Sequence, residues 1–271
     1  MNHTLPRFGL LTDPVKLVPE EIERFKKLGF DYTEIGIEEP MATPRILAKQ
    51  TKQIRASLAR NKMFAVGHTA YWVQFGSSHK KAREGWIEEA EDMISIASRL
   101  GLHLLNFHFY GRLGKVGSDQ ESTSIFLGNF TDAMRRLTRF ANANNVQLML
   151  ENVPTDRNGI GRIHNFSSVM NAVPHLKFHL DVGHAFIENR MTGVYSYIDS
   201  FGDRLAHVHI HDNHGEDDEH LPLGYGKIDF KKVVKWLKSI DYVETITFEI
   251  FTSHADAVRS REYLRKLWID D

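Results

Sequence analysis

The sequence predicts an α/β protein that folds as a single closed (β/α)8 barrel over residues 1–271. Short apolar, β-branched runs alternate with amphipathic helical patterns along the chain, and no linker or low-complexity segment separates them. Strict alternation of this kind predicts a parallel sheet covered by helices. Eight repeats in about 250 residues favour a closed sheet. An open doubly wound sheet is the competing fold, but no GxGxxG turn follows the first expected strand.

Runs rich in branched and aromatic residues give the expected strands. In chain order they are FGLLT (8–12), YTEIGI (32–37), MFAVGH (63–68), HLLNFHF (103–109), VQLMLEN (146–152), KFHLDVG (177–183), LAHVHIHD (205–212) and TITFEIF (245–251). A segment with apolar residues at helical spacing follows each of them. These helices are expected over residues 19–29, 44–60, 83–101, 125–145, 166–173, 194–202, 229–240 and 254–268.

Composition limits the chemistry and the partners. The 34 Lys and Arg balance 35 Asp and Glu, so the net charge indicates neither a nucleic-acid partner nor an acidic-membrane partner. The absence of cysteine excludes disulfides, thiolate nucleophiles and zinc–thiolate sites, so any metal must be held by histidines and carboxylates. No apolar run is long enough to span a bilayer, and the N-terminus does not resemble a signal peptide. We expect a cytoplasmic protein without a membrane partner; a homo-oligomer is possible.

Histidines and carboxylates collect where the expected strands end, which is the rim at which such barrels do their chemistry. In HVHIH (207–211), alternate histidines share one face of a strand. An ionised carboxylate at the end of an apolar strand is costly unless it is paired, and a metal ion is the simplest partner for Glu151 and Glu249. The residues expected at this rim are His68, His108, Glu151, Asp181, His184, His209, His211, Asp218, His220 and Glu249.

Several motifs, taken together and in order, give the chain a family resemblance. They are GHTAY (67–71), LGLHLLNFH (100–108), LEN (150–152), LDVGHAF (180–186), HIHD (209–212), DEHLPLGYGKID (218–229) and FEIF (248–251). With these motifs the sequence resembles the xylose isomerase-like TIM barrels. That superfamily includes endonuclease IV (AP endonuclease family 2) and many sugar or sugar-phosphate isomerases and epimerases.

The resemblance implies one to three divalent ions. One position would use His68, His108 and Glu151. A second, used by the single-metal isomerases, would use Glu151, Asp181, His209 and Glu249. A third would use His184, Asp218 and His220. These ligand types suit zinc or manganese best, with magnesium or cobalt possible.

The expected function is that of a metal-dependent isomerase or epimerase acting on a small sugar or sugar phosphate. A chelated carbonyl and hydroxyl would make the proton between them easier to remove. Glu151 and Glu249 would then act as base and acid on an enediolate, and His184 would polarise a substrate oxygen. The candidate substrate contacts are Tyr71, Trp72, Tyr110, Arg157, His211 and Lys227.

Two departures from the family pattern argue against a simple ketose epimerase. Related enzymes carry a substrate-binding Glu and Arg at the positions that are Arg157 and Gly215 here. An endonuclease IV-like phosphodiesterase acting at abasic sites in DNA is therefore the main alternative, because the ligand set is complete and Tyr71 matches a DNA-contacting tyrosine. Its usual first-strand motif is absent, and the acidic EEPMATPR (38–45) replaces a basic loop. A non-catalytic metal-binding barrel is the third alternative.

The remaining histidines are expected to have other roles. We expect His103, His175 and His179 to be ordinary barrel or helix-facing residues. His207 shares its face with His209 but lies deeper, so we expect it to support the site from the core. His211, near the rim, is expected to orient a ligand or to contact substrate.

Overall fold

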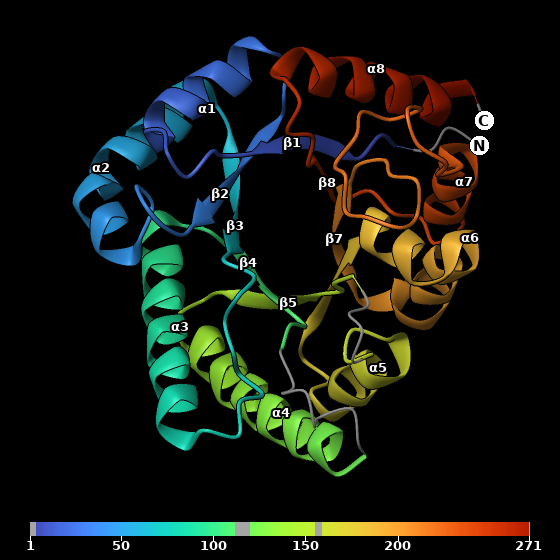
Figure 1. Ribbon diagram of the computed structural model, residues 1–271. Helices are drawn as coiled ribbons and strands as arrows, with labels where there is room; N and C mark the ends of the chain where they lie inside the picture. The colour runs from blue at the N-terminus through green and yellow to red at the C-terminus, as the bar shows by residue number, and fades with distance from the viewer. Residues whose placement is uncertain (1–3, 112–119, 155–158, 271) are drawn as a thin grey trace.

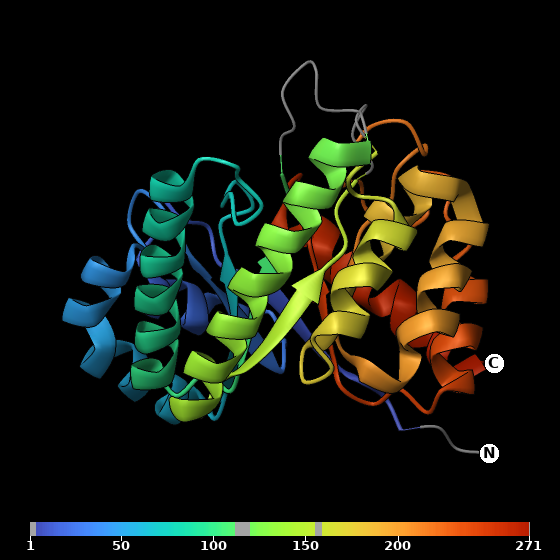
Figure 2. The same ribbon diagram turned by 90° about the horizontal axis from the view of Figure 1, so that it is seen from below.

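The computed structural model describes residues 4–111, 120–154 and 159–270. Within these residues, eight parallel strands close into a barrel in chain order, and β8 pairs with β1. Helices surround the barrel, as seen along its axis in Figure 1. The predicted (β/α)8 barrel is therefore confirmed. Figure 2 shows from the side that the arrow of β5 points toward the face that carries the long connecting segments.

The strands lie close to the predicted ranges. They are β1 (Arg7–Leu11), β2 (Tyr32–Ile37), β3 (Phe64–Thr69), β4 (Leu104–His108), β5 (Gln147–Glu151), β6 (Lys177–Asp181), β7 (Leu205–Ile210) and β8 (Thr245–Phe248). The helices are α1 (Val18–Lys27), α2 (Pro44–Asn61), α3 (Lys80–Leu100), α4 (Gln120–Ala143), α5 (Ile163–Ala172), α6 (Val182–Phe201), α7 (Phe230–Ser239) and α8 (His254–Asp270). A short 3-10 helix, Gly202–Arg204, leads into β7.

The sixth helix begins well before the predicted residue 194. Its start is set by Asp181, the last residue of β6, whose side chain accepts a hydrogen bond of 2.6 Å from the backbone N–H of His184. A carboxylate at this position satisfies an N–H that the helix itself leaves free. Non-helical angles at Asn189 and Arg190 then kink the helix. His184 consequently lies on the first helical turn and not in a loop.

The barrel interior changes from apolar to polar along its axis. Tyr32, Val66 and Met149 form a small buried cluster inside it. The Tyr32 hydroxyl lies 2.7 Å from Thr247 Oγ1, and Gly9 leaves room for the tyrosine ring, because a Cβ there would lie 2.5 Å from it. The main apolar core includes Phe109, Phe130 and Phe166, which pack edge to face. The packed interior thereby holds rigid the strand ends that carry the site.

Membrane insertion finds no support in the described residues. None of the helices there has both the length and the apolar content needed to cross a bilayer.

Candidate active site

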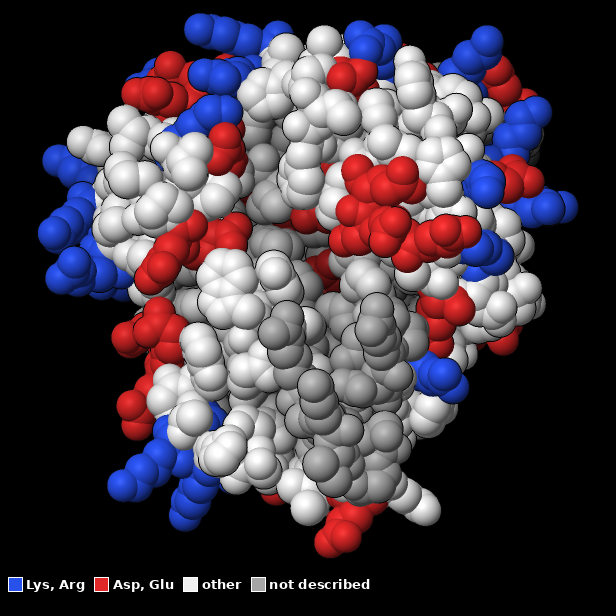
Figure 3. Space-filling model, viewed as in Figure 1, with Lys and Arg blue, Asp and Glu red and all other residues white. Residues whose placement is uncertain are grey.

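Most of the predicted rim residues meet in one cavity of about 550 Å³. It opens at the face where the strands end, near the centre of the view in Figure 3. Histidines and carboxylates from β3, β4 and β5, from α6, and from the segments after β7 and β8 line it, namely His68, His108, Glu151, His184, Asp218, His220 and Glu249. Asp181, His209 and His211 are fully buried beside them.

The first cluster consists of His68, His108 and Glu151. Their potential ligand atoms all lie within 4.8 Å of one another. Glu151 Oε2 lies 3.0 Å from His108 Nε2 and 3.8 Å from His68 Nε2. The same oxygen accepts a hydrogen bond from the amide of Asn106 on β4. The three predicted ligands of the first position therefore do come together.

The central cluster surrounds His209. Nδ1 of this imidazole lies 3.9 Å from Glu151 Oε1, 4.0 Å from Asp181 Oδ2 and 3.5 Å from Glu249 Oε2. Potential ligand atoms of Glu151, Asp181 and His209 lie within 4.8 Å of one another, and Glu249 meets the same limit with His68 and His209. Side chains from β5, β6 and β7, and from the end of β8, thus converge on one point.

The outer cluster contains His184, Asp218 and His220, as predicted, and also His211. Asp218 Oδ2 lies 3.1 Å from both His184 Nε2 and His220 Nε2. His211 Nε2 lies 3.6 Å from Asp218 Oδ1 and 3.3 Å from Asp181 Oδ1. His211 was expected to contact substrate or orient a ligand, but its position makes it a possible ligand itself.

Glu151, Asp218 and Glu249 stay ionised, because the pKa of each carboxyl group is lowered. Burial favours a raised pKa for Glu151, but the neighbouring His108 and His179 outweigh it and hold this pKa well below its usual range. Burial likewise acts against protonation of His184, yet Asp181 and Asp218 raise its pKa well above the ordinary value. For His220, Asp218 and Glu249 outweigh burial and raise the pKa to about 9. The carboxylates beside His184 and His220 therefore favour a positive charge at these rings. A divalent cation bound there would interact with the same carboxylates in place of the protons.

Unpaired polar atoms test whether these residues fit a metal ion. Among the described residues, Asp181 Oδ2, His209 Nδ1 and both ring nitrogens of His68 and of His211 are buried without a hydrogen-bond partner. Buried polar atoms without partners are rare and costly. Each of these residues has a potential ligand atom within 4.8 Å of those of the other residues of its cluster, and imidazole and carboxylate donors together suit zinc or manganese. The donor set and its geometry therefore fit a divalent ion.

Glu34 is a site residue that the sequence prediction missed. It lies inside the barrel on β2 and is fully buried. Its Oε2 accepts from His209 Nε2 at 2.9 Å and from His207 Nε2 at 3.1 Å. Burial would raise its pKa, but the charges of His209 and His207 outweigh it and hold that pKa well below its usual range. An acidic residue in the otherwise uncharged YTEIGI strand was the signal that could have identified it.

The histidines for which other roles are expected are either buried in the barrel or exposed on the surface. His207 lies deep in the barrel, as expected, with its Nδ1 2.6 Å from Thr245 Oγ1. His103 and His175 are exposed. His179 is more than an ordinary barrel residue, because its Nδ1 lies 3.3 Å from Glu151 Oε2 and its ring centroid 4.1 Å from that of His209.

Some of the predicted substrate contacts line the active-site cavity and others lie outside it. Tyr71 and Tyr110 line the cavity, together with the unpredicted Glu38 and Phe251. Trp72 lines a neighbouring cavity instead. Lys227 is exposed and lies outside the lining. Arg157 lies outside the described residues.

Gly215, at the second departure from the family pattern, lies against an arginine from another element. The guanidinium of Arg190, at the kink of α6, donates a hydrogen bond to the Gly215 carbonyl. A Cβ at position 215 would collide with that guanidinium. A guanidinium therefore lies beside position 215, although residue 215 itself is a glycine.

A closed parallel barrel with a histidine–carboxylate centre at the ends of its strands belongs to the class of (β/α)8 barrels built for chemistry at that rim. The chain belongs to the xylose isomerase-like TIM barrel family, whose model matches residues 22–267. This confirms the resemblance noted in the sequence.

Several relatives are sugar epimerases and others have no assigned function, and a probable endonuclease 4 of Campylobacter concisus is 29% identical over 115 residues, covering 41% of this chain and 38% of the relative. An uncharacterised protein of Methanocaldococcus jannaschii is 27% identical over 268 residues, covering 96% of this chain and 88% of the relative. Fructoselysine 3-epimerase of Escherichia coli O157:H7 is 25% identical over 251 residues, covering 86% and 85%. The crystal structure of a D-tagatose 3-epimerase-like protein superposes with a TM-score of 0.84 at 26% identity, covering 96% of both chains. The relatives support a role in sugar epimerisation or isomerisation.

Proposed function

We propose that this protein is a divalent-metal-dependent isomerase or epimerase that acts on a small sugar or sugar phosphate. One observation carries the proposal. Glu151 and Glu249 come from strands that are not neighbours, yet both approach His209 Nδ1, at 3.9 and 3.5 Å, in a cavity open to solvent. Two carboxylates on either side of one ligand position are what proton removal and return at a sugar carbon require. The two sugar 3-epimerase-related proteins described above support a 3-epimerase in particular.

The central cluster would hold the ion, with His209, Asp181, Glu151 and Glu249 as ligands. When bound, a divalent ion polarises a carbonyl and an adjacent hydroxyl and so acidifies the proton between them. Glu151 would take that proton, leaving an enediolate. Glu249, which lines the open cavity, would first take up a proton from solvent and would then return it to the substrate from its own side. His184 would donate a hydrogen bond to a substrate oxygen. Asn106, through its amide hydrogen bond, would keep the Glu151 carboxylate in place.

Zinc and manganese are the expected ions, because imidazole nitrogens and carboxylate oxygens are mixed in the first, the central and the outer cluster. The first and outer clusters would hold further ions if the protein uses more than one.

The phosphodiesterase alternative draws support from the three clusters lying side by side, since several ions can clamp a phosphate between attacking and leaving oxygens. The charge of the cavity mouth speaks against it. Figure 3 shows acidic side chains on two sides of the central hollow and lysines and arginines mostly toward the periphery of this face. A duplex binder needs several cations near its site to contact phosphates. The small sugar is therefore the better supported substrate.

Proton exchange in D₂O tests the proposal directly. Metal-loaded protein should incorporate deuterium at the carbon next to the carbonyl of at least one ketose or ketose phosphate, and Glu151→Gln should abolish the exchange. The exposed His175→Ala is the matched control and should exchange at the normal rate. Cleavage of abasic-site DNA without exchange into any sugar would support the phosphodiesterase. Metal binding without either activity would support the non-catalytic barrel.

A further inference from the structure

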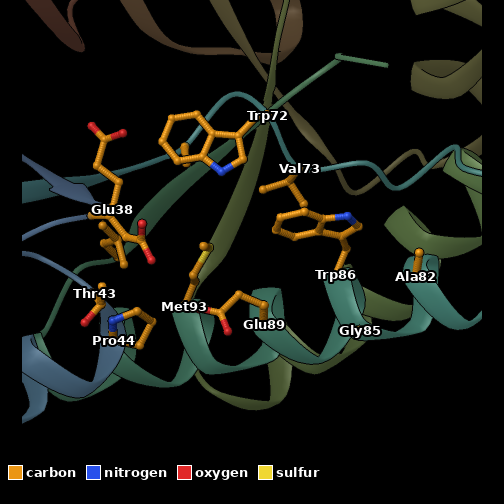
Figure 4. Close-up of a pocket in the computed structure, with 13 residues that line it drawn as sticks. Glu38, Thr43, Pro44, Trp72, Val73, Ala82, Gly85, Trp86, Glu89 and Met93 are labelled. Carbon is orange, nitrogen blue, oxygen red and sulfur yellow. The ribbon is translucent and has the colours of Figure 1, made fainter. Parts of the chain in front are cut away.

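A second cavity, of about 630 Å³, lies directly beside the candidate active site. The segment after β2, the segment after β3 and one face of α3 enclose it. Figure 4 shows the indole rings of Trp72 and Trp86 at this space, together with Met93, Glu38 and Glu89. The proposed chemistry uses none of its indoles.

Three carboxylates give this cavity its charge. Glu38 is half-buried between the two cavities, whereas Glu39 and Glu89 are exposed at the rim of the second one. None of the three forms an ion pair with another residue in the described part of the chain. Burial, Asp92 and Glu39 all raise the pKa of Glu89, so only negative groups act on it at this edge. The residues that line this cavity therefore include three carboxylates and no lysine or arginine.

The aromatic walls add a preference for the same kind of ligand. The electron-rich face of an indole attracts a cation within about 6 Å, and tryptophan does so best among the aromatic residues. Trp72 is 40% exposed and Trp86 is partly buried, so both rings present accessible surface. Aromatic faces beside carboxylates favour an ammonium group and disfavour a phosphate or carboxylate.

The two cavities are continuous in their walls. Glu38 lines both of them. The ring of Trp72 packs edge to face on that of Tyr71, with 5.4 Å between the centroids, and Tyr71 lines the active-site cavity. One molecule could thus place a sugar over the central cluster and extend a substituent between these residues into the second cavity.

We propose that the second cavity is a subsite for a primary ammonium group carried on an arm of the sugar substrate. This inference rests on the proposed function for the sugar part and on the cavity itself for the cationic part. It narrows the substrate class from small sugars in general to sugars with a cationic substituent. A purely apolar substituent is the competing occupant of an indole-lined cavity.

Binding of pentylammonium, which represents the cationic arm without the sugar, tests the subsite independently of catalysis. Tryptophan emission should change saturably with pentylammonium, and pentylammonium should bind at least tenfold more tightly than 1-pentanol. The double variant Glu39→Gln/Glu89→Gln should weaken pentylammonium binding at least fivefold. Glu88→Gln removes one charge from the neighbouring exposed position of α3, outside the cavity lining, and should change little. Equal binding of the alcohol, no saturable binding, or an unaffected double variant would overturn the subsite.

Measuring turnover tests whether the second cavity binds an arm of the same molecule whose sugar reacts in the active site. Proton exchange is compared for a ketose with a 5-aminopentyl arm and for the same compound acetylated on the amine. The charged compound should have at least tenfold higher kcat/KM, and the double variant should erase this preference without altering exchange into the unsubstituted ketose. Equal rates for the two compounds in the unaltered protein would overturn the proposal. Pentylammonium binding with no exchange into any sugar would support the cation site and contradict the proposed function.

Discussion

The imidazole of His209 is held at both of its nitrogens. Nε2 donates to Glu34 at 2.9 Å, and Nδ1 faces the carboxylates of the central cluster. When Nε2 carries the donated proton, the Nδ1 lone pair points at negative oxygens. Only a proton or a cation at Nδ1 makes that arrangement favourable. Glu34 is therefore a positioning residue, because it fixes both the orientation and the tautomer of a proposed ligand.

Replacing Glu34 by glutamine tests this role. Without the carboxylate, His209 loses a charged acceptor, so we expect the affinity for zinc or manganese to fall roughly ten- to a hundredfold. Metal Kd is measured by competition with a chelator, and folding by circular dichroism. Glu20→Gln, which alters an exposed acid on α1, is the control and should bind metal normally. A Glu34→Gln protein with unchanged metal Kd would show that Glu34 has no positioning role.

Replacing two histidines one at a time distinguishes a proposed metal ligand from a surface residue. His209→Ala should remove activity and lower the metal content, since it takes the central nitrogen from its cluster. His175→Ala should leave both unchanged, because His175 is exposed and the substitution keeps the backbone carbonyl that accepts a hydrogen bond from Gln147. Metal analysis of both variants checks the prediction, and similar losses in the two would argue against the central cluster as the metal site.

At the scale of elements, one buried carboxylate organises the segment between β7 and α7. Asp212 accepts from the backbone N–H groups of Asn213, Gly224, Gly226 and Ile228 at 2.8 to 3.2 Å. The segment between these anchor points carries Asp218 and His220. The outer cluster therefore depends on the side chain of Asp212, which is not one of its potential ligands.

Asp212→Ala should loosen this segment. Leaving several buried N–H groups without an acceptor should lower the free energy of unfolding by about 3 kcal/mol, as measured by urea denaturation. Trypsin should then cleave faster at Lys227. For comparison, Asp229→Ala removes only the cap of α7, where the side chain accepts from Lys232 N–H at 3.2 Å, and should cost about 1 kcal/mol. Equal stability losses in the two variants would contradict the anchoring role of Asp212.

At the scale of the whole molecule, the net charge is close to zero but the charges are distributed unevenly over the surface. The formal net charge is −1, yet acidic side chains gather around the central hollow. A field of this sign repels phosphate backbones and attracts cations. The whole-molecule electrostatics thus favour the sugar substrate and the proposed ammonium subsite together.

Salt dependence measures this preference. For an uncharged sugar, kcat/KM should change little between about 50 and 200 mM salt, because no phosphate-bound counterions are released. A nuclease that contacts several phosphates would lose orders of magnitude in affinity over the same range. Steady-state exchange rates for the sugar, and binding of abasic duplex DNA, are measured side by side. Steeply salt-dependent, tight DNA binding would contradict the assignment.

Local sequence patterns determine much of this protein. Alternating strand and helix patterns predicted the barrel, because each pattern depends on which face of its own element is buried. The histidines and carboxylates at strand ends predicted the rim, because all parallel strands end on the same side. The first cluster and most of the outer cluster followed from the motifs.

The tertiary structure decided which side chains from different elements meet. Glu34 became a site residue because the closed barrel brings β2 across to β7, far away in sequence. His211 joined the outer cluster, and Trp72 faced the second cavity, because those directions depend on the stagger of the strands and on the connecting segments. The start of α6 at Val182 depended on a hydrogen bond that the Asp181 side chain accepts from the backbone N–H of His184. Spacing along the chain specifies the face and the end of one element, whereas the distance between elements is set by how all of them pack.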